Sequence, residues 1–181
     1  MSTNYLYEQL PHLAPVSSSQ ANKELKLLAA ELDSALQGQF SADMFSATPK
    51  IEAEYKGFPV RVAGMNHGIF GYDISVSLIV LLPRPTDYRL KLQNVVSVRH
   101  SFFVDIENLA NVEPYHNMDE DLLEKVLPYA LLQYLQESKI DFLITITADR
   151  VVLSMYGLYD HQVYLSLLDI LIDMARALMD S

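Results

Sequence analysis

The chain has 181 residues, a formal net charge of −10 and no cysteine. The charge argues against nucleic acid as a partner, because such binding depends on cations that neutralise phosphates. The lack of cysteine excludes disulfides, thiolate nucleophiles and cysteine-based metal sites, and it fits the reducing cytoplasm, where we expect the protein. We expect no membrane span, since the longest apolar run is Leu78 to Leu82, and no secretory signal, since no basic-then-apolar leader opens the chain.

The first 18 residues carry prolines and a serine run without any helical or strand period, so we expect an irregular leader over 1–18. Residues 19–181 are expected to form one α+β domain. Its first helix is predicted over 19–37, because a serine precedes a leucine stripe and Gly38 stands where a C′ glycine belongs. This helix is amphipathic, with one side buried.

A β-hairpin is predicted next, since apolar and polar residues alternate on both sides of a two-residue turn. The turn at Lys56 and Gly57 places Tyr55 opposite Phe58. Glycine suits it, because primed hairpin turns need a positive φ.

A long strand is predicted over 70–82. On one of its faces Ser75 and Ser77 are followed by Ile79 and Leu81. We therefore expect the strand to pass from a region covered on one face into a region covered on both.

The segment 83–89 places two arginines and a tyrosine at a proline-stiffened turn. Arginine is suited to bidentate recognition of a carboxylate or phosphate. Two interpretations stay open: the arginines pair with nearby acids of the chain, or they contact an acidic ligand or partner. The candidate contact residues are Arg84, Asp87, Tyr88 and Arg89.

Further strands are predicted over 88–93 and, less regularly, over 95–104. A polar loop leads to a second helix over about 118–137. Asn117 and Glu120 resemble a capping box at its start, and Pro128 is expected to kink or divide it.

A second hairpin is predicted over 142–156. A loop at Ala148 and Asp149 sets apolar residues opposite one another, and a loop shifted by one residue keeps the same faces paired. Gly157 then breaks the strand, and Asp160 is expected to cap the last helix.

The last helix is apolar except for one narrow stripe. The polar residues of this stripe are Ser166, Asp169, Asp173, Arg176 and Asp180. Such a helix must be covered on more than one side. Either it lies on a sheet with another helix across it, or part of it meets a second protein chain, for instance a second copy in a homodimer.

No phosphate-binding, serine-nucleophile or zinc-protease motif occurs in the chain. His116, Asp119 and Asp121 are close in sequence, but acids at a helix start serve as caps, and we predict no metal or cofactor. His161 beside Asp160 is interpreted as helix-start chemistry rather than a catalytic dyad. These absences favour a protein that is not an enzyme.

The elements predict an α+β fold: a mainly antiparallel sheet of five to seven strands with three helices, in the order α-β-β-β-β(-β)-α-β-β-α. This order and the acidity are similar to those of type III secretion chaperones. The resemblance implies a small, acidic, dimeric protein that holds segments of a partner. The extra strand around residues 88–93 departs from the simplest pattern.

The leading hypothesis is a non-enzymatic protein-binding module, an adaptor or chaperone-like protein, whose partner is another protein, with a basic protein as one candidate. Two alternatives stay open. One is an acidic immunity-type inhibitor of a toxin. The other is a small-molecule binder or enzyme with a pocket near residues 84–89.

Overall fold

The computed structural model describes residues 18–40, 48–66, 74–94, 115–127, 131, 142–157 and 160–181. The elements run in the order α2 (Ser18–Glu31), β1 (Lys50–Tyr55), β2 (Phe58–Asn66), β3 (Ile74–Leu81), β4 (Leu90–Asn94), β5 (Tyr115–His116), α3 (Glu120–Val126), β6 (Phe142–Thr147), β7 (Arg150–Tyr156) and α5 (His161–Met179). This order confirms the predicted α+β class. The expected leader and the expected strand over 95–104 lie outside the described residues.

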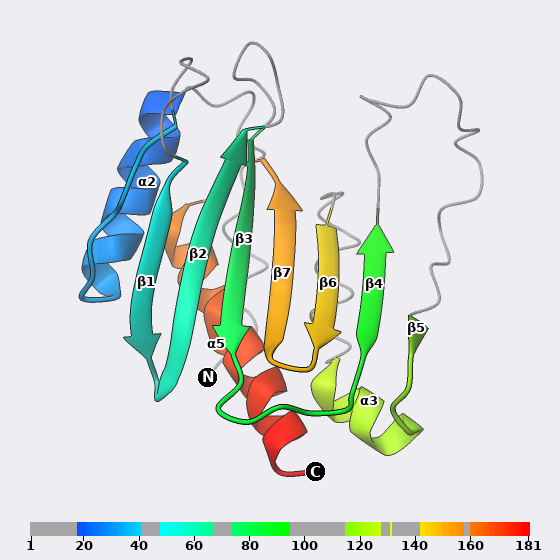
Figure 1. Ribbon diagram of the computed structural model, residues 1–181. Helices are drawn as coiled ribbons and strands as arrows, with labels where there is room; N and C mark the ends of the chain where they lie inside the picture. The colour runs from blue at the N-terminus through cyan, green and yellow to red at the C-terminus, as the bar shows by residue number, and fades with distance from the viewer. Residues whose placement is uncertain are drawn as a thin grey trace, which may run out of the picture.

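The strands form one sheet in the order β1-β2-β3-β7-β6-β4-β5, and all neighbours are antiparallel (Figure 1). The extra strand predicted around residues 88–93 is β4, which pairs with β6. It therefore lengthens the sheet at one end and does not interrupt the run of five strands from β1 to β6.

Both predicted hairpin turns are confirmed. Tyr55 faces Phe58 across the first turn, where Lys56 has a φ of 50° and Gly57 a φ of 84°, as a primed turn requires. Thr147 faces Arg150 across the second turn, so its loop is the pair at 148–149. Local pairing of apolar residues was sufficient to set both registers.

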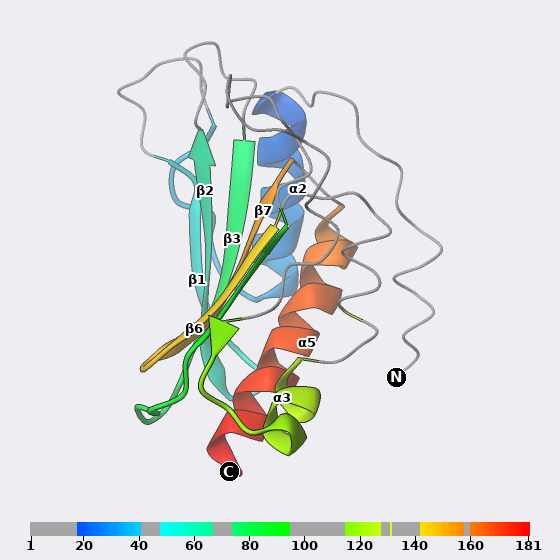
Figure 2. The ribbon, with the colours of Figure 1, turned by 90° about the vertical axis from the view of Figure 1, so that its right-hand side faces the viewer.

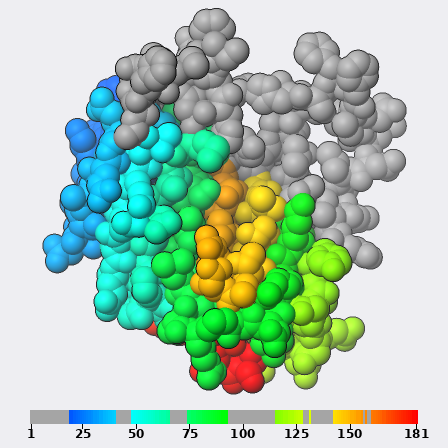
Figure 3. Space-filling view, in the orientation of Figure 1, coloured from blue at the N-terminus to red at the C-terminus, as the bar shows by residue number. Residues whose placement is uncertain are grey.

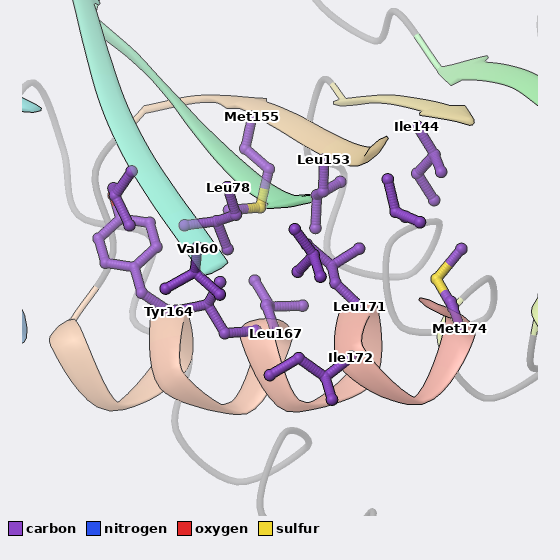
Figure 4. Close-up of a cluster of buried hydrophobic side chains, with 14 of the residues drawn as sticks. Val60, Leu78, Ile144, Leu153, Met155, Tyr164, Leu167, Leu171, Ile172 and Met174 are labelled. Carbon is purple, nitrogen blue, oxygen red and sulfur yellow. The ribbon is translucent and has the colours of Figure 1, made fainter. Parts of the chain in front are cut away.

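The described helices all lie on one face of the sheet (Figure 2). α5 packs across β3 and β7 and touches α2 and α3 on its flanks. Figure 4 shows side chains of α5, among them Leu167 and Leu171, pointing toward Leu78 and Leu153 of the sheet. These four side chains are at most 1% exposed, so the main core lies between α5 and the central strands.

The first helix is shorter than predicted. It ends at Glu31, where Asp33 N–H donates to Ala30 O (3.1 Å) and Ser34 N–H to Ala29 O (2.9 Å). These bonds and the φ of 49° at Asp33 form a Schellman-type end, so an aspartate fills the position expected for Gly38. The chain is then free to pair Gln37 with Lys50 of β1.

The second helix begins differently from the prediction. Its N-cap is Asp119, whose Oδ1 accepts from Leu122 N–H at 2.8 Å. The Asn117 side chain is used elsewhere, since it accepts from Arg89 N–H and donates to the carbonyl of Asp87. The described helix reaches Val126, and the predicted kink at Pro128 lies outside the described residues.

Residues 115–116 were expected to belong to a loop, and this expectation was wrong. They form β5, which pairs with Leu90 and Lys91 of β4. A two-residue strand has too little sequence to show a period, so only the neighbouring strand reveals it.

Candidate functional site

The apolar character of α5 is accounted for within the chain. The sheet covers one side of the helix, and α2 and α3 cover its flanks. Asp173, Arg176 and Asp180 of the polar stripe are exposed. This is the first of the two arrangements considered for the helix, and it leaves no need for a second chain to explain its composition.

An ion pair links the turn between β1 and β2 to α5. Lys56 Nζ lies 2.6 Å from Asp169 Oδ1 and above the Tyr55 ring. The hydrogen bond from Lys56 to Asp169 raises the pKa of the lysine, and burial is the main cause that raises the pKa of Tyr55. Part of the polar stripe on α5 thus has a structural role.

The candidate contact residues of segment 83–89 lie in the loop between β3 and β4. Arg84 donates to the carbonyl of Met179 at the C-terminal end of α5, where a cation is favourable. Arg89 donates to the carbonyls of Thr86 (3.1 Å) and Tyr88 (2.7 Å). Both arginines therefore bond to backbone carbonyls of the chain.

Of the other two candidates, the Tyr88 side chain packs partly buried against the core, and Asp87 is exposed. All four residues thus lie on one loop. The described contacts do not bring their side chains together at a single point.

This loop lies against the turn of the second hairpin. Leu82 N–H donates to Asp149 O and Thr86 N–H donates to Ala148 O, both at 2.8 Å. The turn adds another ion pair, because Arg150 binds Asp149 through Nε (2.9 Å) and Nη2 (2.6 Å). Sequence reasoning missed Arg150 as a neighbour of the loop, since the contact depends on strand order.

A histidine and two acids meet at the start of α5. His161 Nδ1 lies 2.9 Å from Glu24 Oε2 and 3.6 Å from Asp160 Oδ1, and these ligand-type atoms lie within 4.8 Å of one another. Glu24 Oε2 also accepts from His161 N–H (3.2 Å), and Asp160 Oδ1 caps the helix at Gln162 N–H (2.7 Å).

Both carboxylates thus have partners at the positive end of a helix dipole, which favours anions and opposes a bound cation. The cluster ties α2 to α5. The structure bears out the interpretation of Asp160 as a helix cap, and it adds Glu24, which is remote in sequence.

The face of the sheet opposite the helices has a different composition. Four of its central residues are aliphatic and partly buried: Ile79, Leu81, Leu143 and Val152. We call them the aliphatic patch. Figure 3 views this face, with the strands at the surface and no described helix in front of them. Contrary to expectation, Ile79 and Leu81 are only partly buried.

Comparison of the chain with protein-family models, with curated proteins and with solved structures found no significant match. None of the described helices is long and apolar enough to cross a membrane. The surfaces of this chain therefore carry the information about its function.

Proposed function

We propose that the protein is a non-enzymatic protein-binding module of the adaptor or chaperone-like kind, working in the cytoplasm. The observation that carries the proposal is the aliphatic patch on the face of the sheet without described helices. An antiparallel sheet can leave one face in water, but that face is then usually polar. Adjoining aliphatic side chains on such a face are typical of a surface that a partner covers.

The bonds of five polar residues in the described part of the chain support binding over catalysis. Arg84 and Arg89 bond to backbone carbonyls, and Glu24, Asp160 and His161 bond to one another and to the start of α5. A catalytic group needs hydrogen-bonding capacity directed toward a substrate. The bonds of these groups are instead directed toward the fold.

A tagged pull-down from the native host, with mass spectrometry of the eluate, tests the proposal. We expect one protein at stoichiometric amount. Light scattering of the purified chain should be run in parallel, because a homodimer through α5 is the other assembly considered above. A monomer that captures no stoichiometric protein contradicts the binding module and favours a small-molecule site near residues 84–89.

The second candidate function is an immunity-type inhibitor of a toxin, and the charge of the helical side favours it. α3 and its cap carry Asp119, Glu120, Asp121 and Glu124 against Lys125. Such a surface attracts a basic partner and speeds its association. Replacing Glu120, Asp121 and Glu124 by lysine should then abolish capture of the partner, whereas a partner held by the sheet should remain bound.

The residues Arg84, Asp87, Tyr88 and Arg89 remain a proposed contact site of the module. Their test is the double variant Arg84→Ala with Arg89→Ala. Capture of the partner at wild-type level by this variant removes the loop from the interface.

A further inference from the structure

We infer that the face of the sheet opposite the helices binds an amphipathic α-helix of a partner protein whose apolar stripe is bordered by acidic residues. This inference rests on the proposed binding function and deepens it, because it specifies the surface and the chemistry of the partner. It starts from two properties of that face: the contiguity of the aliphatic patch and the sign of the charges around it.

The aliphatic patch is contiguous because of the strand register. Ile79 of β3 pairs with Val152 of β7, and Leu81 follows Ile79 on the same face of β3. Leu143 of β6 pairs with Ser154 and is thus the diagonal neighbour of Val152. The four side chains span three adjacent strands, and each is partly exposed.

Cations border the aliphatic patch although the chain is acidic overall. One row across the sheet reads Arg61, Ile79, Val152, Thr145 and Lys91. Arg150 lies opposite Leu81. Two of these cations are paired with acids of the chain: Arg61 lies 2.7 Å from Glu52 of β1, and Arg150 lies 2.6 Å from Asp149 of the adjacent turn. Lys91 is exposed and forms no ion pair with the described residues.

The spacing of these cations fits a helix. Arg61 on β2 and Lys91 on β4 are separated by four strand spacings, or roughly 19 Å at about 4.8 Å each. A helix with its side chains is about 10–12 Å wide. It can therefore lie on the aliphatic patch between the two cations, with acidic residues on its borders directed toward Arg61 and Lys91.

Other occupants fit the described surface less well. A strand added to the edge at β1 meets Gln37, which is already paired there with Lys50, and Ser34, which donates to the carbonyl of Glu52. A second copy has little to offer from its described helices, since Leu27 is their one exposed large hydrophobic residue. A basic helix is repelled by the bordering cations.

Site-specific photo-crosslinking tests the inference. Benzoylphenylalanine replaces Val152 in one full-length chain and Leu27, on the outer side of α2, in a matched control. Each chain is irradiated in lysate of the native host, and the crosslinked peptide is sequenced. We expect Val152→benzoylphenylalanine to label a segment with apolar residues at i, i+3 and i+4 and acids beside them. The Leu27 control should not label it.

The labelled segment, made as a fluorescent peptide, provides the quantitative test. Lys91→Glu should weaken its binding by about tenfold, since it replaces an attraction by a like-charge contact. Val152→Glu should weaken binding by more than about tenfold by burying an unpaired charge. The control Lys26→Glu, on α2, should change binding less than about twofold. Circular dichroism must show that each variant is folded.

The outcomes separate this inference from the proposed function. A partner that is captured by wild type but labelled from Leu27 and not from Val152 overturns the inference and leaves the binding function intact. Labelling of a basic segment, or of a second copy of this chain, also overturns it. A wild-type chain that captures no stoichiometric protein contradicts the function itself, and the inference fails with it.

Discussion

The two faces of the sheet are built from alternate residues of the same strands, yet they meet different surroundings. In β7, Val151 is fully buried beneath the helices, whereas its neighbour Val152 is partly exposed on the other face. In β3, Val80 and Ile79 differ in the same way. Aliphatic residues are therefore present on both faces, but in the described structure helices cover only one of them (Figure 2).

The faces also differ in charge. The helical side bears the acids of α3 and α5, while β2, β7 and β4 carry Arg61, Arg150 and Lys91 on the other face. Composition alone gives one net charge for the whole chain and hides this division. One face therefore stabilises the fold, and the other is the face that we propose for binding.

The largest expected effect comes from truncating a leucine on each face. Leu153→Ala leaves a cavity in the main core and should lower the free energy of unfolding by about 2–5 kcal/mol. Leu143→Ala removes the same atoms from the partly exposed face and should cost about 1 kcal/mol or less. Urea unfolding, followed by circular dichroism, measures both.

Equal losses for the two leucine variants would contradict the comparison, because they would mean that Leu143 is as fully packed as Leu153 in the free protein. Ile79→Val provides a milder check on the same face. It should leave the unfolding midpoint almost unchanged.

The parts of the fold that the sequence predicted are those fixed by local pairing. The hairpin at Ala148 and Asp149 needed only alternation and apolar matching, and the cap at Asp160 needed only a suitable residue before an apolar helix. The first helix was predicted too long because its leucine stripe continues to Leu36. The actual end of the helix depends on Asp33, which adopts a positive φ. Glycine is the usual signal for that conformation.

The parts that could not be predicted depend on contacts between distant segments. The pairing of β3 with β7 and of β4 with β6 brings the loop that holds Arg84 against the turn at Ala148 and Asp149, which precedes Arg150. No periodicity in either segment contains that information. For the same reason the link from Glu24 to His161 was missed. Ile79 and Leu81 were expected on a face that is fully covered, but both are only partly buried.

A smaller effect is expected from enlarging one side chain by a single heavy atom on each face of β2. Gly64 lies on the helical face, and a Cβ there would come within 2.6 Å of Pro49 Cγ and nearer still to the Phe40 ring. Asn22 holds Phe40 in place through hydrogen bonds to both its N–H and its carbonyl. Gly64→Ala should therefore destabilise the protein by about 1–3 kcal/mol.

The matched control for the glycine variant is Ala63→Ser, which enlarges the neighbouring side chain on the other face. We expect its melting temperature to stay within about 2 °C of wild type, as a surface substitution should. A Gly64→Ala protein that melts at the wild-type temperature would show that Phe40 moves aside without cost.

The smallest expected effect concerns the ion pair at the end of the sheet face opposite the described helices. The hydrogen bond from Arg150 is the main cause that lowers the pKa of Asp149 from 3.8 to about 2. A carboxylate with a depressed pKa stabilises the folded state above its ordinary pKa, and this contribution is lost as the pH falls from about 4 to about 2. Both side chains are exposed to solvent, so the change in stability should be small.

Carbon NMR of the Asp149 carboxyl group measures this pKa directly. In Arg150→Gln the pKa of Asp149 should rise toward 3.8, because the guanidinium that favours the charged form is gone. In the control Arg84→Gln it should stay near 2, since Arg84 binds the carbonyl of Met179 instead. A pKa of Asp149 near 3.8 in the wild type as well as in Arg150→Gln would mean that the ion pair is absent in solution. Arg150 could then bind an acidic partner without first breaking its ion pair with Asp149. That result would support this face as a binding surface.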